Sequence, residues 1–188
     1  MALMLLALAT LPLQSGSVPL AADQEAWVFG QCQSKASEIA HRRIAVVQCE
    51  QGDMFGSTIV VDAGTASYYH LVVFDAGHVA WSTAHMSADR DRARQDGVSV
   101  TTGTVIDGSP AALVRIDWSH QDYREGSDGH DLTVVWRGPW TKHSDVVVCS
   151  IGETPACTAP LRIDGQAAIS LRGGTLHVGT KTYAIGSS

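Results

Sequence analysis

Short runs of β-branched and apolar residues recur along most of this 188-residue chain, and they limit what it can fold into. Gly, Pro and Asp separate the runs closely, as turns separate strands. No run alternates with a helical pattern of about 10–15 residues, which argues against a doubly wound α/β fold. We therefore predict a mainly β fold, an antiparallel β-sandwich or open barrel, in a single domain over residues 23–188. The runs cover residues 44–50, 57–64, 68–82, 98–107, 111–119, 131–138 and 167–186.

Residues 23–40 also fit a helix. Ala26, Phe29, Cys32, Ala36 and Ile39 recur at helical spacing. A strand over residues 26–32 that pairs with residues 44–50 is the alternative. Of the two, we favour the helix, so that the β domain would carry one helix near its N-terminus.

The first 22 residues predict export. The segment MALMLLALATLPL is almost wholly apolar from Ala2 to Leu13 but shorter than the roughly 20 residues that a bilayer span needs. Small residues follow it, so it fits a signal peptide cleaved after Ser17 or after Ala22, although no cationic side chain precedes Lys35. A buried N-terminal helix is the alternative. We expect a periplasmic or secreted protein with no membrane span after processing, and ten arginines against three lysines point to a GC-rich bacterial genome.

Four cysteines remain after the leader, at Cys32, Cys49, Cys149 and Cys157. Their number is even and the expected compartment is oxidising, so disulfides are the default. No C-x-x-C is present, which argues against a thioredoxin-type redox pair and a zinc ribbon. The spacing favours two bridges, Cys32 with Cys49 and Cys149 with Cys157.

The stretch CSIGETPAC, residues 149–157, places Gly and Pro between two strand-like flanks. A Cys149–Cys157 bridge would close one hairpin and contribute roughly 2–3 kcal/mol in the chain-entropy model. We expect residues 151–156 to form an exposed, mobile tip that serves as a contact loop, with Ile151, Glu153 and Thr154 as binding residues. The alternative is a solvated turn with no partner.

The most polar stretch, residues 117–131, holds several carboxylates and two histidines. Carboxylates close together in a Gly-containing loop suit calcium, although their spacing does not match an EF-hand. Two histidines with an Asp suit zinc instead. We therefore consider a calcium or zinc site at His120, Asp122, Asp128 and His130. Otherwise the stretch is a solvated loop that binds no cofactor.

Charge and motifs narrow the function further. The net charge of −6 and the absence of a basic cluster argue against nucleic-acid binding. No nucleophile elbow, P-loop, G-x-G-x-x-G or H-E-x-x-H is present, so we assign no catalytic residue and lean against an enzyme. Trp136 and Trp140 flank a Gly-Pro turn, where exposed rings can stack on a sugar or anchor a protein; core packing is the alternative.

Together these observations predict an exported bacterial β-rich binding protein whose partner is a protein or a carbohydrate. An inhibitor or an immunity-type protein fits this description, because such proteins are small, exported and cross-linked. The alternative is a hydrolase whose His, Asp and Ser residues come together from distant parts of the chain.

Overall fold

The computed structural model describes residues 9–14, 33–48, 68–75, 78–86, 92–121, 123–127, 132–136 and 138–187. These residues form β-strands joined by turns and loops, and the described part contains no helix. The prediction of a mainly β fold is therefore confirmed. Three sheets make up the described structure, and all pairings but one are antiparallel.

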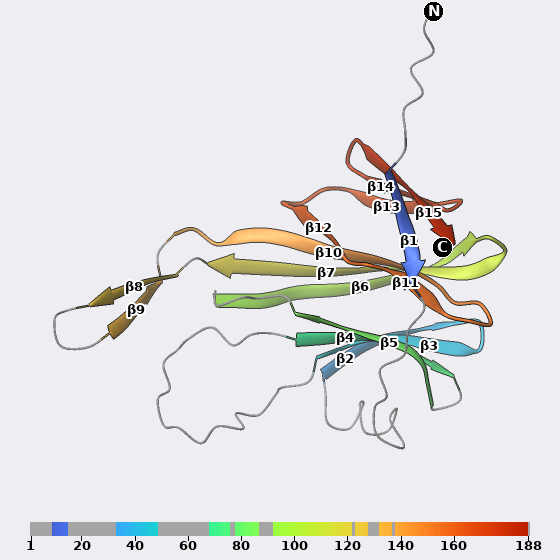
Figure 1. Cartoon of the computed structure of the whole chain (residues 1–188), viewed down its shortest axis with the longest axis horizontal. Helices are drawn as coiled ribbons and strands as arrows, with labels where there is room; N and C mark the ends of the chain where they lie inside the picture. The colour runs from blue at the N-terminus through green and yellow to red at the C-terminus, as the bar shows by residue number, and fades with distance from the viewer. Residues whose placement is uncertain are drawn as a thin grey trace, which may run out of the picture.

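A nine-stranded sheet forms the body of the molecule (Figure 1). Its strand order is β13-β14-β15-β1-β11-β10-β7-β6, and β12 pairs with β10 beside β11. The sheet curls until β13 comes close to β6, which gives a nearly closed barrel. Its strands are β1 (Ala9–Gln14), β6 (Arg92–Ile106), β7 (Ser109–Gln121), β10 (Thr141–Ser150), β11 (Ala156–Thr158), β12 (Leu161–Asp164), β13 (Ile169–Arg172), β14 (Thr175–Val178) and β15 (Lys181–Ser187).

A four-stranded sheet packs against one face of the nine-stranded sheet (Figure 1). It contains β2 (Gln33–Ile39), β3 (Arg42–Gln48), β4 (Tyr68–Asp75) and β5 (His78–Met86). A separate hairpin of β8 (Tyr123–Ser127) and β9 (Leu132–Trp136) follows β7. The architecture is thus a sandwich in which one layer also curls into a barrel.

The two central strands β7 and β10 are buried on both faces, which explains their nearly continuous apolar runs. Alternate side chains of a strand point to opposite faces. In β7, Val114 and Ile116 face the core between the two sheets, whereas Ala111 and Leu113 face the barrel interior. Two hydrophobic cores therefore share one pair of strands.

The structure corrects the expectation of a helix over residues 23–40. Residues 33–39 form strand β2, which pairs with β3 through a two-residue turn at Ala40 and His41. Ala40 takes a positive φ of 55°, as a tight hairpin turn requires. Ile39 is buried while Ala36 is exposed, so the residues that recur at helical spacing do not form one buried face. Residues 23–32 lie outside the described residues.

Strand β1 overlaps the expected signal peptide. It lies between β15 and β11, parallel to β15 over five residue pairs and antiparallel to β11 over two. Leu13 is buried in the barrel core and Leu11 is half-buried beside it. Cleavage after Ser17 or Ala22 would therefore detach a strand that this structure includes in the barrel.

Candidate functional site

The Cys149–Cys157 disulfide closes the end of the hairpin between β10 and β11. The two cysteines lie directly opposite each other in the ladder, and their sulfur atoms are 2.08 Å apart. This confirms the predicted bridge. Cys32 and Cys49 lie outside the described residues, so the second bridge stays a prediction.

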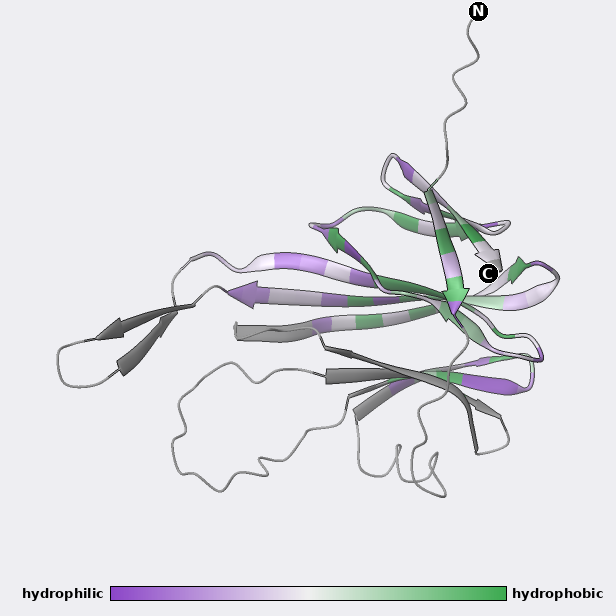
Figure 2. Ribbon diagram, in the orientation of Figure 1, coloured by the Kyte–Doolittle hydropathy of each residue, from purple (hydrophilic) through white to green (hydrophobic). Residues whose placement is uncertain are grey.

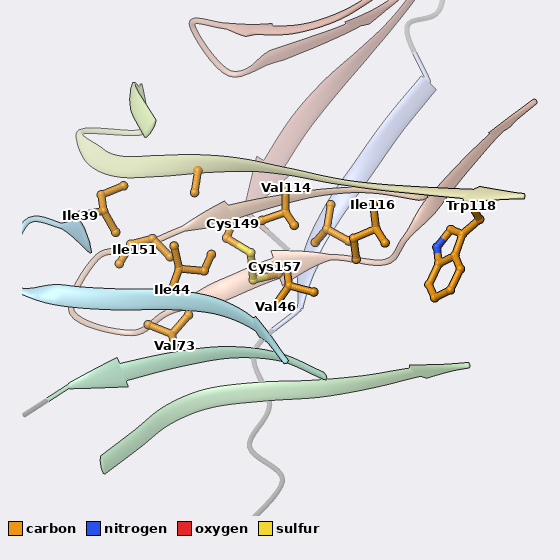
Figure 3. Packing of buried hydrophobic residues seen from close by; sticks show 12 residues of the cluster. Ile39, Ile44, Val46, Val73, Val114, Ile116, Trp118, Cys149, Ile151 and Cys157 are labelled. Carbon is orange, nitrogen blue, oxygen red and sulfur yellow. A yellow bond between two sulfur atoms is a disulfide. The ribbon is translucent and has the colours of Figure 1, made fainter. Parts of the chain in front are cut away.

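The bridge lies in the core between the two sheets rather than at the surface (Figure 3). Cys149 and Cys157 are 0% and 1% exposed, and Figure 3 draws them between Val114 of the nine-stranded sheet and Val46 of the four-stranded sheet. Sulfur here packs like a small apolar group. Since thiol–disulfide exchange needs access to sulfur, the bridge is structural.

Residues 151–155, which lie between the two cysteines, are called the stapled loop below. The backbone and the side chain of Ile151 fix the start of this loop. The backbone N–H of Ile151 donates to the carbonyl oxygen of Pro110 at 2.7 Å, and the Ile151 side chain is 2% exposed. Gly152 comes so close to Ser109 that a Cβ at this position would lie 2.7 Å from Ser109 Oγ. A larger residue here would therefore force the Ser109 side chain to shift.

Arg42 of β3 anchors the stapled loop to the other sheet. Its guanidinium donates to the carbonyl oxygen of Gly152 and, at 3.1 Å, to that of Glu153. The Arg42 residue is 8% exposed, so these charge-assisted bonds lie in a sheltered site. The loop is therefore held by both sheets.

The predicted contact residues are placed in two different environments. Ile151 belongs to the core between the sheets, while Glu153 and Thr154 are exposed at the tip. Pro155 is buried and returns the chain to β11. The tip thus exposes one carboxylate and one hydroxyl, and a binding role for them stays a prediction.

The predicted tryptophan surface is only partly described. Trp136 ends β9, but its side chain is outside the described structure, and Trp140 is half-buried just before β10. Between them, Gly138 has a φ of +115°, and its carbonyl oxygen accepts a 2.9 Å hydrogen bond from Gln121 Nε2. A stacking role for the two rings stays a prediction.

Of the predicted metal ligands, His120 alone is described; Asp122, Asp128 and His130 lie outside the described residues. His120 lies near the end of β7 with its ring centroid 5.4 Å from that of His143 on β10. Within the described ranges, no three His, Cys, Asp or Glu side chains are arranged to hold a metal ion. The calcium or zinc site stays a prediction.

His143 is a titratable residue that the sequence interpretation missed. It is 5% exposed, and its Nε2 has no hydrogen-bond partner among the described residues. Burial is the main cause that lowers the pKa of His143 below its usual 6.5, and the nearby positive charge of Arg162 lowers it further. The sequence gives no signal for its burial, because its neighbours Lys142, Ser144 and Asp145 are polar as well.

Comparisons with known proteins assign no family. No protein-family model matches the chain, and no curated protein or solved structure is significantly similar to it. In the described part of the chain, no helix has the length and apolar character needed to cross a membrane.

Proposed function

We propose that this chain is an exported bacterial binding protein that presents the stapled loop to a protein partner, as an inhibitor or an immunity-type protein does. The observation that carries the proposal is the double anchoring of an exposed tip. Glu153 and Thr154 face solvent, while the residues on either side of them are fixed by the disulfide, the Ile151 amide and Arg42.

Anchoring favours binding because a loop that is already ordered loses little conformational entropy when a partner contacts it. Ordering a rotamer-rich side chain at an interface costs about 0.5–1.5 kcal/mol, and a loose loop adds backbone cost. The backbone of the stapled loop is already ordered by folding, so binding requires little further loss of conformational entropy.

Charge indicates what kind of partner fits. The tip carries the Glu153 carboxylate, and the whole chain has a net charge of −6. Opposite charge accelerates encounter and suppresses wrong partners. The partner we propose therefore presents a basic surface to the tip. The disulfide supports an oxidising compartment, where such bonds persist.

The hydrolase alternative receives no support from the described residues. A serine nucleophile in a site built from His, Asp and Ser uses the histidine as its base. The hydroxyl of Ser144 instead donates directly to Asp117 at 2.6 Å, and that of Ser119 donates to Asp96. His143 precedes Ser144 on the same strand, so its side chain points to the opposite face.

Affinity capture on the purified exported protein, followed by mass spectrometry, tests the proposal. The bait is compared with a double variant, Glu153→Gln with Thr154→Ala, and with Glu38→Gln, which neutralises an exposed carboxylate on β2. A partner retained by the wild type and by Glu38→Gln but lost from the tip variant is the expected result. Partners that bind all three baits equally would refute a role for the tip.

A further inference from the structure

A polar cavity lies at one end of the barrel, away from the stapled loop. Its volume is about 320 Å³, and its walls include Asp96, Arg115, Asp117, Lys142, Ser144 and Gln166. In Figure 2, β7 and β10 change from green near the middle of the molecule to purple toward the C-terminal end of β7 and the start of β10. Mouths of barrels are recurrent places for small-molecule sites.

The strand register explains why polar side chains gather there. Ser144 of β10 lies directly opposite Asp117 of β7, so both side chains project from the same face. Alternation places Arg115 and Lys142 on that face as well. Further along the same face, Leu113 and Val146 belong to the barrel core. The cavity therefore has polar walls at the end of an apolar interior.

A hydrogen-bond network fixes the Asp117 carboxylate. Its Oδ1 accepts from Arg115 Nε at 2.7 Å and from Ser144 Oγ at 2.6 Å. Arg115 also donates through Nη1 to the carbonyl oxygen of Ala167 at 3.4 Å, which ties β7 to the segment before β13. Both bonds to the carboxylate use Oδ1. Among the described residues none donates to Oδ2, and the Asp117 side chain is 39% exposed.

Lys142 supplies the complementary donor. It is exposed beside the cavity. Its backbone carbonyl accepts from the N–H of Gly165 at 2.9 Å, whereas its side chain makes no ion pair or hydrogen bond with the described residues. A fixed acceptor and a positively charged donor thus border one small space. A hydroxyl group can donate to the first and accept from the second, because it carries both functions.

The negatively and positively charged side chains in the cavity walls are equal in number. Asp96 and Asp117 contribute two negative charges, and Arg115 and Lys142 contribute two positive ones. A phosphate or carboxylate ligand would meet two carboxylates, and a cationic ligand would meet two cations, so neither sign is favoured. A volume near the lower end of the usual range of about 300–1,000 Å³ suits a ligand the size of one sugar ring.

We propose that this cavity is a binding site for an uncharged, hydroxyl-rich molecule of monosaccharide size, with Asp117 Oδ2 accepting from one hydroxyl and Lys142 donating to another. The ligand is either a free monosaccharide or the terminal unit of a glycan, since both present the same hydroxyl groups. The site is independent of the stapled loop, so either proposal can fail without the other.

Titration of the purified full chain with neutral sugars tests the proposal. The probes are glucose, galactose, mannose and N-acetylglucosamine, and glucose 6-phosphate and glucosamine are the charged comparators. NMR and calorimetry measure the binding. A neutral sugar is expected to bind saturably and more tightly than its charged forms. Methyl glycosides and short oligosaccharides then separate a free sugar from a glycan end. No saturable binding up to about 50 mM, or tighter binding of a charged form, would overturn the proposal.

Two variants link binding to the site. Lys142→Met removes the charged donor from an exposed position and is expected to weaken binding about tenfold, with the melting temperature unchanged. Lys181→Met is the matched control, because Lys181 is also exposed on a strand but does not line the cavity. Asp117→Asn removes the charged acceptor and is expected to weaken binding to a similar extent. If Lys142→Met binds as tightly as Lys181→Met, the assignment is wrong.

Discussion

Arg42 on β3 donates a hydrogen bond to the carbonyl oxygen of Glu153, a residue 111 positions later in the chain. This contact joins the four-stranded sheet to the stapled loop of the nine-stranded sheet. A buried guanidinium with two backbone carbonyl partners does more than pair charges, because it satisfies two backbone acceptors in a part-buried site. It therefore stabilises the packing of the sheets and the shape of the loop together.

Arg42→Met tests this role. Methionine keeps most of the side-chain volume but leaves both carbonyl oxygens without their donor. We expect the free energy of unfolding to fall by about 1–3 kcal/mol. The amides of Glu153 and Thr154 should also exchange faster with deuterium, because the loop is no longer held. Urea denaturation and hydrogen-exchange mass spectrometry measure the two effects.

Arg43→Met is the matched control, since Arg43 is the neighbouring arginine but makes an exposed ion pair with Glu38 at 2.9 Å. Such pairs contribute little, and we expect a change within about 0.5 kcal/mol. Equal destabilisation by both variants would show that Arg42 acts by general packing and not through the loop.

The buried disulfide predicts resistance to reduction in the folded state. Cys149 is 0% exposed, so dithiothreitol should reduce the bond only through unfolding, and its rate should rise with urea. Replacing both cysteines by alanine should lower the free energy of unfolding by roughly 2–3 kcal/mol through the lost loop constraint. Thiol alkylation and mass spectrometry follow the first effect, and denaturation follows the second. Rapid reduction of the native protein without denaturant would contradict the buried position.

The sequence predicted the strands well where local patterns and packing agree. The predicted run at residues 68–82 forms the paired strands β4 and β5, and Gly173 and Gly174 mark the turn between β13 and β14. The Cys149–Cys157 pair followed from its own spacing. In these places a turn residue with positive φ or a short closed loop determines the structure locally.

Sequence interpretation failed where long-range pairing decides the structure. Residues 33–39 carry a weak helical period, but pairing with β3 determines their conformation. The cavity could not be predicted either, because Asp117 and Ser144 meet only through the register of β7 and β10. The polar stretch at residues 117–131 was recognised, yet Asp117 binds Ser144 on a neighbouring strand and not a residue of that stretch.

His143 predicts a loss of stability at acidic pH. Burial first, and then Arg162, lowers the pKa of His143 in the folded protein, whereas Asp145 and Asp164 act in the opposite direction. The unfolded state then binds the proton more readily, so the contribution is fully present above pH 6.5 and is lost as the pH falls through the folded pKa. His120 lies beside His143 and lowers the pKa of His143 further.

Urea denaturation at a series of pH values measures this effect. The wild type should lose stability as the pH falls below 6.5, and His143→Gln should lose less over the same interval. His177→Gln serves as control, since His177 is a half-buried histidine on β14, far from this pair in the strand order. Parallel pH profiles for the wild type and His143→Gln would exclude His143 as the titrating group.

Because β1 is part of the barrel, removal of the N-terminal segment should lower the stability of the folded protein. If the exported protein starts after Ser17 or Ala22, β11 and β15 each lose a neighbour, and the core around Leu13 is exposed. Burial of one leucine contributes about 1.5–3 kcal/mol, so a chain that begins at residue 23 should be less stable by at least about 1.5 kcal/mol than one that keeps residues 9–14. Mass spectrometry of the exported protein identifies its first residue, and thermal unfolding compares the two forms.

A synthetic peptide spanning residues 8–15 should raise the melting temperature of the shorter form, because the open edges can pair with an added strand. A version with Leu11 and Leu13 replaced by serine should not. Equal stability of the two forms, with no effect of the peptide, would show that β1 adds nothing to the folded barrel.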